Sequence, residues 1–140
     1  MNFEVWRPWV RLAFFELEIW EYILYPAMAG VNFAHFDTRF CLVGHTHVPV
    51  IFCHRPQEAC EAFAPSYGRP VSLGEDRLII NPGSVGQPRD GDPRASYVIL
   101  DPEELTIEYR RVAYPVEVTQ KRMMERGLPP RLIARLAFGW

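Results

Sequence analysis

Two histidines, His45 and His47, stand one residue apart directly after an apolar run. Side chains alternate along an extended segment, so residues i and i+2 point to the same side. Two imidazoles placed in this way can bind a metal ion. Gly44 before the pair and Pro49 after it favour a strand that ends in a tight loop, where ligand sites of α/β proteins tend to lie. We call residues 44–49 the histidine loop.

A second loop, rich in glycine and proline, covers residues 81–93 and follows an apolar run at residues 77–80. If the strands before the two loops are neighbours in one sheet, the loops lie side by side and line one opening. The functional interpretation then places Asn81 or Arg89 next to a phosphate group, and the structural interpretation is a turn that needs glycine and proline. These residues alone do not decide between the two interpretations. We call residues 81–93 the Gly/Pro loop.

Composition indicates one globular domain, and its net charge does not indicate a particular class of partner. Of the 140 residues 49% are hydrophobic, which is enough for a sizeable core. The net charge of -2 gives no reason to expect nucleic acid or an anionic membrane as a partner. Three cysteines without a Cys-x-x-Cys spacing predict neither a disulfide framework nor a four-cysteine zinc site, so a cytoplasmic location is expected. Cys53 and His54 either complete an adventitious zinc site or are ordinary strand residues.

The hydrophobic pattern predicts a mixture of strands and helices. Strands are expected at residues 40–43, 50–53 and 77–80, a hairpin at 96–100 with 105–112, and helices at 27–36, 115–126 and 131–138. Residues 55–74 read as loop or irregular hairpin. Residues 9–24 are apolar on nearly all faces of a helix, but four charged residues interrupt them, so neither a membrane span nor a secretory signal is predicted. The expected fold class is α/β, with an antiparallel portion in the sheet.

The motif GHTHVP at residues 44–49, followed by INPGSVGQPRDGDPRASYVILD at residues 80–101, resembles the C-terminal half of the calcineurin-like metallophosphoesterases, in particular their small prokaryotic phosphodiesterase branch. The resemblance covers residues 20–140. It implies half of a four-layer α/β/β/α sandwich that hydrolyses phosphate mono- or diesters at a centre of two divalent metal ions, manganese, iron or zinc. By resemblance, His47 ligates the first metal and His45 the second.

The sequence departs from the family pattern at the other ligands. The family also uses an Asp-x-His, a bridging Asp in Gly-Asp, an Asn-His pair and a further His, and this chain offers none of them in the required context. We therefore expect a truncated copy: a helical or poorly ordered leader at residues 1–19 and a partial phosphoesterase domain at residues 20–140. The alternatives are a phosphoesterase lacking most of its ligands, and an inactive remnant or binding module. Half a sandwich leaves apolar sheet faces open, so self-association is expected.

Overall fold

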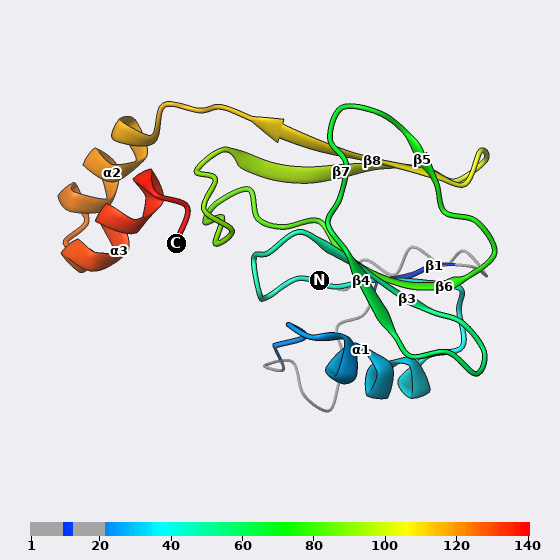
Figure 1. The fold of residues 1–140 in the computed structure, drawn as a ribbon. Helices are drawn as coiled ribbons and strands as arrows, with labels where there is room; N and C mark the ends of the chain where they lie inside the picture. Colours follow the sequence, from blue (N-terminus) through cyan, green and yellow to red (C-terminus); the bar gives the residue numbers. More distant parts are fainter. Residues whose placement is uncertain (1–9, 13–21) are drawn as a thin grey trace.

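The computed structural model describes residues 10–12 and 22–140, which form two β-sheets packed face to face (Figure 1). The larger sheet has the strand order β1-β2-β6-β3-β4 and the smaller one β5-β8-β7. The strands are β1 (Val10–Leu12), β2 (Phe40–Leu42), β3 (Val50–His54), β4 (Glu61–Phe63), β5 (Val71–Ser72), β6 (Arg77–Asn81), β7 (Ala95–Asp101) and β8 (Thr106–Val112). The helices are α1 (Pro26–Asn32), η1 (Phe33–His35), α2 (Val116–Glu125), α3 (Pro130–Ala134) and η2 (Arg135–Ala137).

The centre of the larger sheet is apolar on both faces, which is why its strands read as continuous hydrophobic runs. On the face toward the smaller sheet, four residues of the larger sheet pack against three residues that lie on or beside the smaller one. The cluster consists of Phe40, Cys53, Leu78 and Ile80 with Leu73, Ile107 and Tyr109. The alternation along β7 and β8 predicted their hairpin, and they pair antiparallel from Ala95↔Val112 to Asp101↔Thr106.

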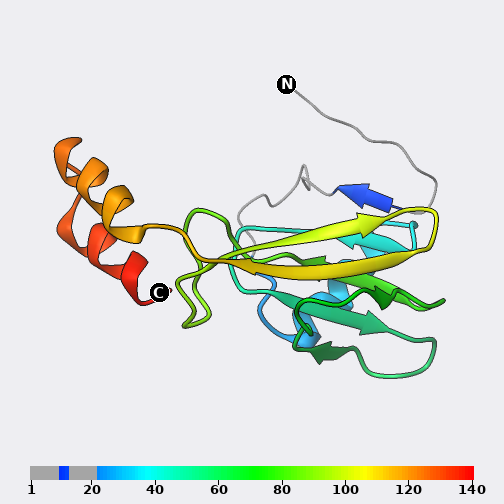
Figure 2. The same cartoon turned by 90° about the horizontal axis from the view of Figure 1, so that it is seen from above.

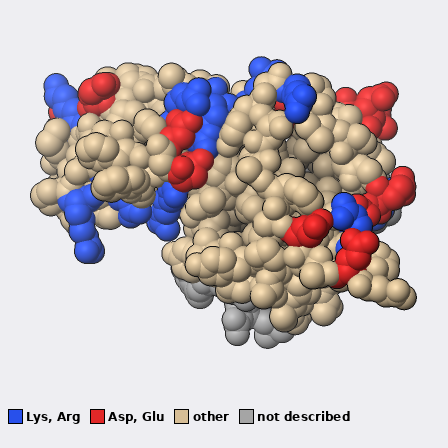
Figure 3. All heavy atoms as spheres, in the orientation of Figure 1, with Lys and Arg blue, Asp and Glu red and all other residues tan. Residues whose placement is uncertain are grey.

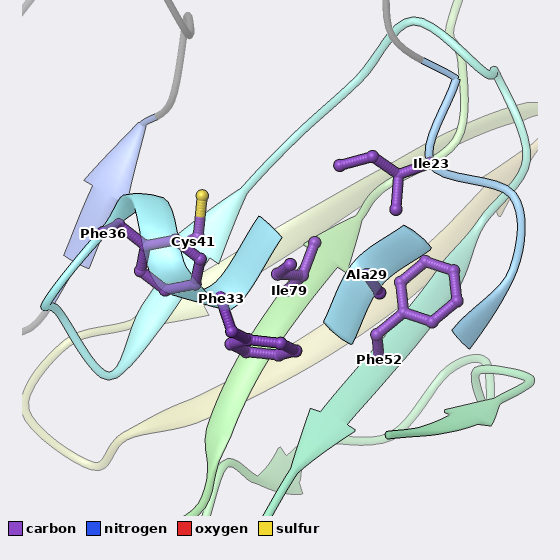
Figure 4. Close-up of a cluster of buried hydrophobic side chains, with 7 residues drawn as sticks. All are labelled: Ile23, Ala29, Phe33, Phe36, Cys41, Phe52 and Ile79. Atoms are coloured by element: carbon purple, nitrogen blue, oxygen red, sulfur yellow. The ribbon is translucent and has the colours of Figure 1, made fainter. Parts of the chain in front are cut away.

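Helix α1 and the 3-10 turn η1 cover the opposite face of the larger sheet. Figure 4 shows Ala29 and Phe33 of this helical segment beside Phe52 of β3 and Ile79 of β6. Pro26 occupies the first turn of α1, where its missing N–H is not needed. The helix and the two sheets thus form three consecutive layers, α/β/β, as the predicted fold class requires.

The C-terminal helices lie beyond the ends of the strands rather than over a sheet (Figures 1 and 2). Helix α2 begins after Pro115 and buries none of its residues. One contact with the sandwich is at Gly139, whose carbonyl accepts from the Gly91 N–H at 3.0 Å. A Cβ atom at Gly139 would lie 2.7 Å from the backbone of Asp92, so only glycine permits this approach. The C-terminal turn is therefore fixed against the Gly/Pro loop.

Three expectations from the sequence need correction or extension. Residues 10–12 form strand β1, parallel to β2, and not part of a helix; the rest of the expected leader lies outside the described residues. Residues 55–74, expected as loop or irregular hairpin, contain two short strands, β4 and β5, which lie in different sheets. The closing helix is divided into α3 and η2. Among the described residues, no helix has the length and apolar character needed to cross a membrane.

Candidate functional site

The histidine loop and the Gly/Pro loop lie side by side, as the sequence predicted. They follow β2 and β6, which are adjacent and parallel, so both strands end at the same edge of the sheet. The backbone N–H of Arg89 in the Gly/Pro loop donates to the carbonyl of His47 at 3.3 Å. A Cβ atom at Gly83 would lie 3.2 Å from Pro49, which shows how closely the two loops pack.

The two histidines are held in left-handed backbone conformations. His45 has φ 70° and His47 has φ 63°. The prediction of an extended segment was wrong here, because alternation applies only to β-region backbone. Such a conformation costs a residue with a Cβ atom roughly 1–2 kcal/mol, and it persists where surrounding contacts enforce it. The Thr46 N–H donates to the Gly44 carbonyl at 2.9 Å between the two strained residues, which closes a tight turn.

One ring nitrogen of His47 is engaged by the neighbouring loop. Nδ1 lies 2.7 Å from the carbonyl oxygen of Gln87. A carbonyl only accepts, so Nδ1 carries the proton and Nε2 keeps its lone pair. Burial lowers the pKa of His47, and the positive charge of Arg89 lowers it too, while the Gln87 hydrogen bond acts in the opposite direction. The neutral tautomer with a free Nε2 lone pair is the form that ligates metals.

The side chain of His45 is partly buried. Its ring is 4.2 Å from the ring of Tyr22, centroid to centroid, with a tilt of 47°. A positive charge on His45 would lower the pKa of His47, which places the two imidazoles within electrostatic reach of each other. The structure thus brings the sequence-predicted pair together in one loop.

Two arginines lie within electrostatic reach of His47. Arg89 is half-buried, donates from Nη2 to the Gln87 side-chain oxygen at 3.1 Å, and has a buried Nε without a hydrogen-bond partner in the described structure. Arg135 of η2 also lowers the pKa of His47 by its charge. Guanidinium groups suit phosphate oxygens. Sequence reasoning missed Arg135, because an arginine in a C-terminal helix carries no signal that the chain returns to the site.

Asn81 lies beneath the histidine loop and is only 1% exposed. Its Nδ2 donates to the Gly44 carbonyl at 3.0 Å and to Thr46 Oγ1 at 2.9 Å, and its Oδ1 accepts from the Gly83 N–H at 2.9 Å. The side chain is therefore occupied by the two loops. This position gives Asn81 no surface on which a substrate could lie, in contrast to the interpretation of Asn81 as a phosphate neighbour.

The donors in the described residues do not by themselves fit a two-metal centre. They contain no group of three or more His, Cys, Asp or Glu side chains arranged to hold a metal ion. Cys53 does not add a ligand: burial and the neighbouring Asp76 raise the pKa of its thiol to about 11, which disfavours the thiolate that metals bind. Two imidazoles lack the carboxylate that bridges and neutralises a metal pair.

The matches with known proteins agree with this fold. Residues 26–105 match the calcineurin-like phosphoesterase superfamily domain. The chain belongs to that superfamily. A metallophosphoesterase from Sphaerobacter thermophilus has a similar structure, with a TM-score of 0.79 and 47% identity over 87% of this chain and 50% of that one.

Two further proteins are similar. An uncharacterized protein of Methanocaldococcus jannaschii is 38% identical over 123 residues, which are 87% of this chain and 47% of that protein. A hypothetical protein from Pyrococcus horikoshii shares the fold, with a TM-score of 0.56 and 17% identity over 84% of this chain and 39% of that one. The chain thus spans about half the length of these relatives or less.

Proposed function

We propose that the histidine loop is this chain's share of a two-metal centre that hydrolyses phosphate mono- or diesters. His47 and His45 are the ligands that the chain contributes, one to each metal ion, with manganese, iron or zinc as the metals. The observation that carries the proposal is the His47 Nδ1 contact with the Gln87 carbonyl, which leaves Nε2 as a ligand atom. Such metal ions, when bound, supply hydroxide and stabilise charge on the phosphate.

The surroundings of the loop support a phosphate ester as the ligand. Arg89 and Arg135 place positive charge near His47, which favours an anionic ligand such as a phosphate ester. Acidic and basic side chains are interspersed over the face seen in Figure 3, which gives no extended basic surface for nucleic acid there. Three cysteines without a Cys-x-x-Cys spacing suit a reducing, cytoplasmic setting.

A second candidate function is a catalytically inactive remnant or binding module of the same fold. The observation that favours it is the lack of a third metal-ligating side chain near the pair among the described residues. In this case the loop binds a metal ion or a phosphate group without turnover. The remaining ligands of an active centre would have to come from outside residues 22–140.

Manganese-stimulated hydrolysis of bis(p-nitrophenyl) phosphate and of p-nitrophenyl phosphate separates the two functions and the two ester classes. The enzyme is supported if activity disappears in His45→Ala and His47→Ala but stays in His35→Ala. His35 is the matched control, because it is an exposed histidine in η1, outside both loops. If the purified chain is inactive with manganese, iron and zinc, the inactive module replaces the enzyme.

A further inference from the structure

A buried chain of hydrogen bonds runs from the smaller sheet to the histidine loop. It begins at Tyr109 of β8, which is 2% exposed. The Tyr109 hydroxyl lies 2.9 Å from the carbonyl of Asn81 and 3.3 Å from the carbonyl of Val50. Val50 directly follows the histidine loop, and Asn81 begins the Gly/Pro loop. One hydroxyl from the opposite sheet therefore contacts the bases of both loops.

Asn81 continues this chain into the histidine loop. Both donors of its amide face that loop, at the Gly44 carbonyl and Thr46 Oγ1, while its oxygen holds the Gly83 N–H of its own loop. Thr46 Oγ1 also accepts from the Val48 N–H at 3.3 Å. Thr46 stands between the two histidines, so these contacts determine where both histidines lie.

The backbone of the loop requires such support. His45 and His47 both have positive φ, and left-handed residues with a Cβ atom occur where neighbouring groups over-determine them. A buried amide that is fully hydrogen-bonded is a rigid support, because breaking any of its contacts leaves a buried polar group unsatisfied.

We propose that Asn81 is a positioning residue, supported by Tyr109, that fixes the backbone conformation and ring orientation of the two histidines. Its importance for metal binding rests on the proposed function, but its effect on the loop does not. Asn81 acts through Gly44 and Thr46 and touches neither metal nor substrate. Residues that orient metal ligands typically change metal affinity by about 10- to 100-fold.

The test is Asn81→Asp, which keeps the size of the side chain and turns the contact with the Gly44 carbonyl from attractive to repulsive. Asn32→Asp is the matched control, since Asn32 is also buried and also donates to a backbone carbonyl, that of Met28, but lies in α1. Nitrogen-15 NMR of the metal-free histidine rings reports the tautomer of His47. Calorimetric titration with zinc chloride reports affinity.

We expect Asn81→Asp to convert His47 from one tautomer to a mixture and to weaken zinc binding about 10-fold or more, with Asn32→Asp unchanged in both. A folded Asn81→Asp with the wild-type His47 spectrum would overturn the proposal.

If Asn81→Asp does not fold, Thr46→Val and Thr46→Ser replace it. Loss of the fixed His47 tautomer in Thr46→Val and its retention in Thr46→Ser would support positioning. Equal His47 spectra of the two variants would refute the proposal. A fixed tautomer without zinc binding would refute the proposed function and leave the positioning role intact.

Discussion

The Nδ1 atom of His47 donates to the carbonyl oxygen of Gln87 at 2.7 Å, although the two residues are 40 positions apart in the chain. The contact joins the histidine loop to the Gly/Pro loop and selects the tautomer of a predicted metal ligand. Because the acceptor is a backbone carbonyl, its position depends on the folding of the whole Gly/Pro loop. The integrity of that loop is therefore a condition for the site.

The pH dependence of His47 follows from its lowered pKa. Its unfolded value is about 6.5, and burial lowers the folded value. At pH values between the folded and the unfolded pKa, the unfolded chain binds more protons than the folded chain. The free energy of unfolding therefore falls as the pH decreases below about 6.5, and the stabilisation from neutral His47 is fully present above that pH. Proton NMR titration should show His47 ionising below 6.5. Arg89→Ala should raise this pKa, and Arg69→Ala should leave it unchanged; a pKa above 6.5 in the wild type would contradict the buried environment.

Gly83→Ala should destabilise the fold by about 2 kcal/mol or more, because two effects combine. Gly83 has φ 84°, and a Cβ atom there would lie 2.8 Å from the Ser96 side chain. Gly86→Ala is the control, since Gly86 has open space around it and no positive φ. Gly91→Ala, with φ 84° and open space, separates backbone strain from the steric clash. Urea unfolding of the three variants gives the comparison, and equal stability of Gly83→Ala and Gly86→Ala would refute the close packing of Gly83 against Ser96.

Arg111 connects β8 to the Gly/Pro loop. Its side chain is 4% exposed, pairs with Asp90, and donates to the Arg94 carbonyl at 3.0 Å and the Tyr67 hydroxyl at 3.1 Å. Arg111→Ala removes these hydrogen bonds and leaves Asp90, which solvent reaches, without this partner, so it should cost about 1–3 kcal/mol. Arg110→Ala, one position away, removes a more exposed pair with Glu108 and should change stability little. Thermal unfolding measures both, and similar melting temperatures would show that Arg111 does not anchor the loop.

We propose self-association through the β4 edge of the larger sheet. Strand β4 is the last strand in that sheet and is exposed throughout, and Phe63 on it is 44% exposed. Within residues 10–12 and 22–140 no strand pairs with the outer edge of β4, and an apolar edge of this kind pairs readily with another chain. Phe63→Lys should reduce the apparent mass in light scattering, whereas Val31→Lys on the exposed side of α1 should not. A monomer at every concentration would contradict this expectation.

The sequence predicted the strands better than the site they position. The alternation in residues 96–112 was sufficient for the β7–β8 hairpin, because each strand has one face toward the core. Alternation was misleading for His45 and His47, since a tight turn has no period of two. Residues 10–12 form a strand because β2 lies next to them, a tertiary contact that local periodicity does not contain.

The sequence was also a poor guide to the roles of individual residues in the site. His45 and His47 were identified from their spacing, but Gln87 contributes through a backbone carbonyl, which any residue type provides. One of two open interpretations put Asn81 or Arg89 beside the substrate, and in the structure the Asn81 amide is turned toward the neighbouring loop. The direction of a side chain relative to a distant loop depends on how the two loops pack. Such packing is not encoded in short spacings.

The central claim is that His45 and His47 are metal ligands, and calorimetric titration of the metal-free chain with zinc and manganese tests it most directly. We predict saturable binding that is weakened about 10-fold or more in His45→Ala and in His47→Ala and is unchanged in His35→Ala. Equal binding by all four proteins, or no binding by the wild type, would contradict the claim.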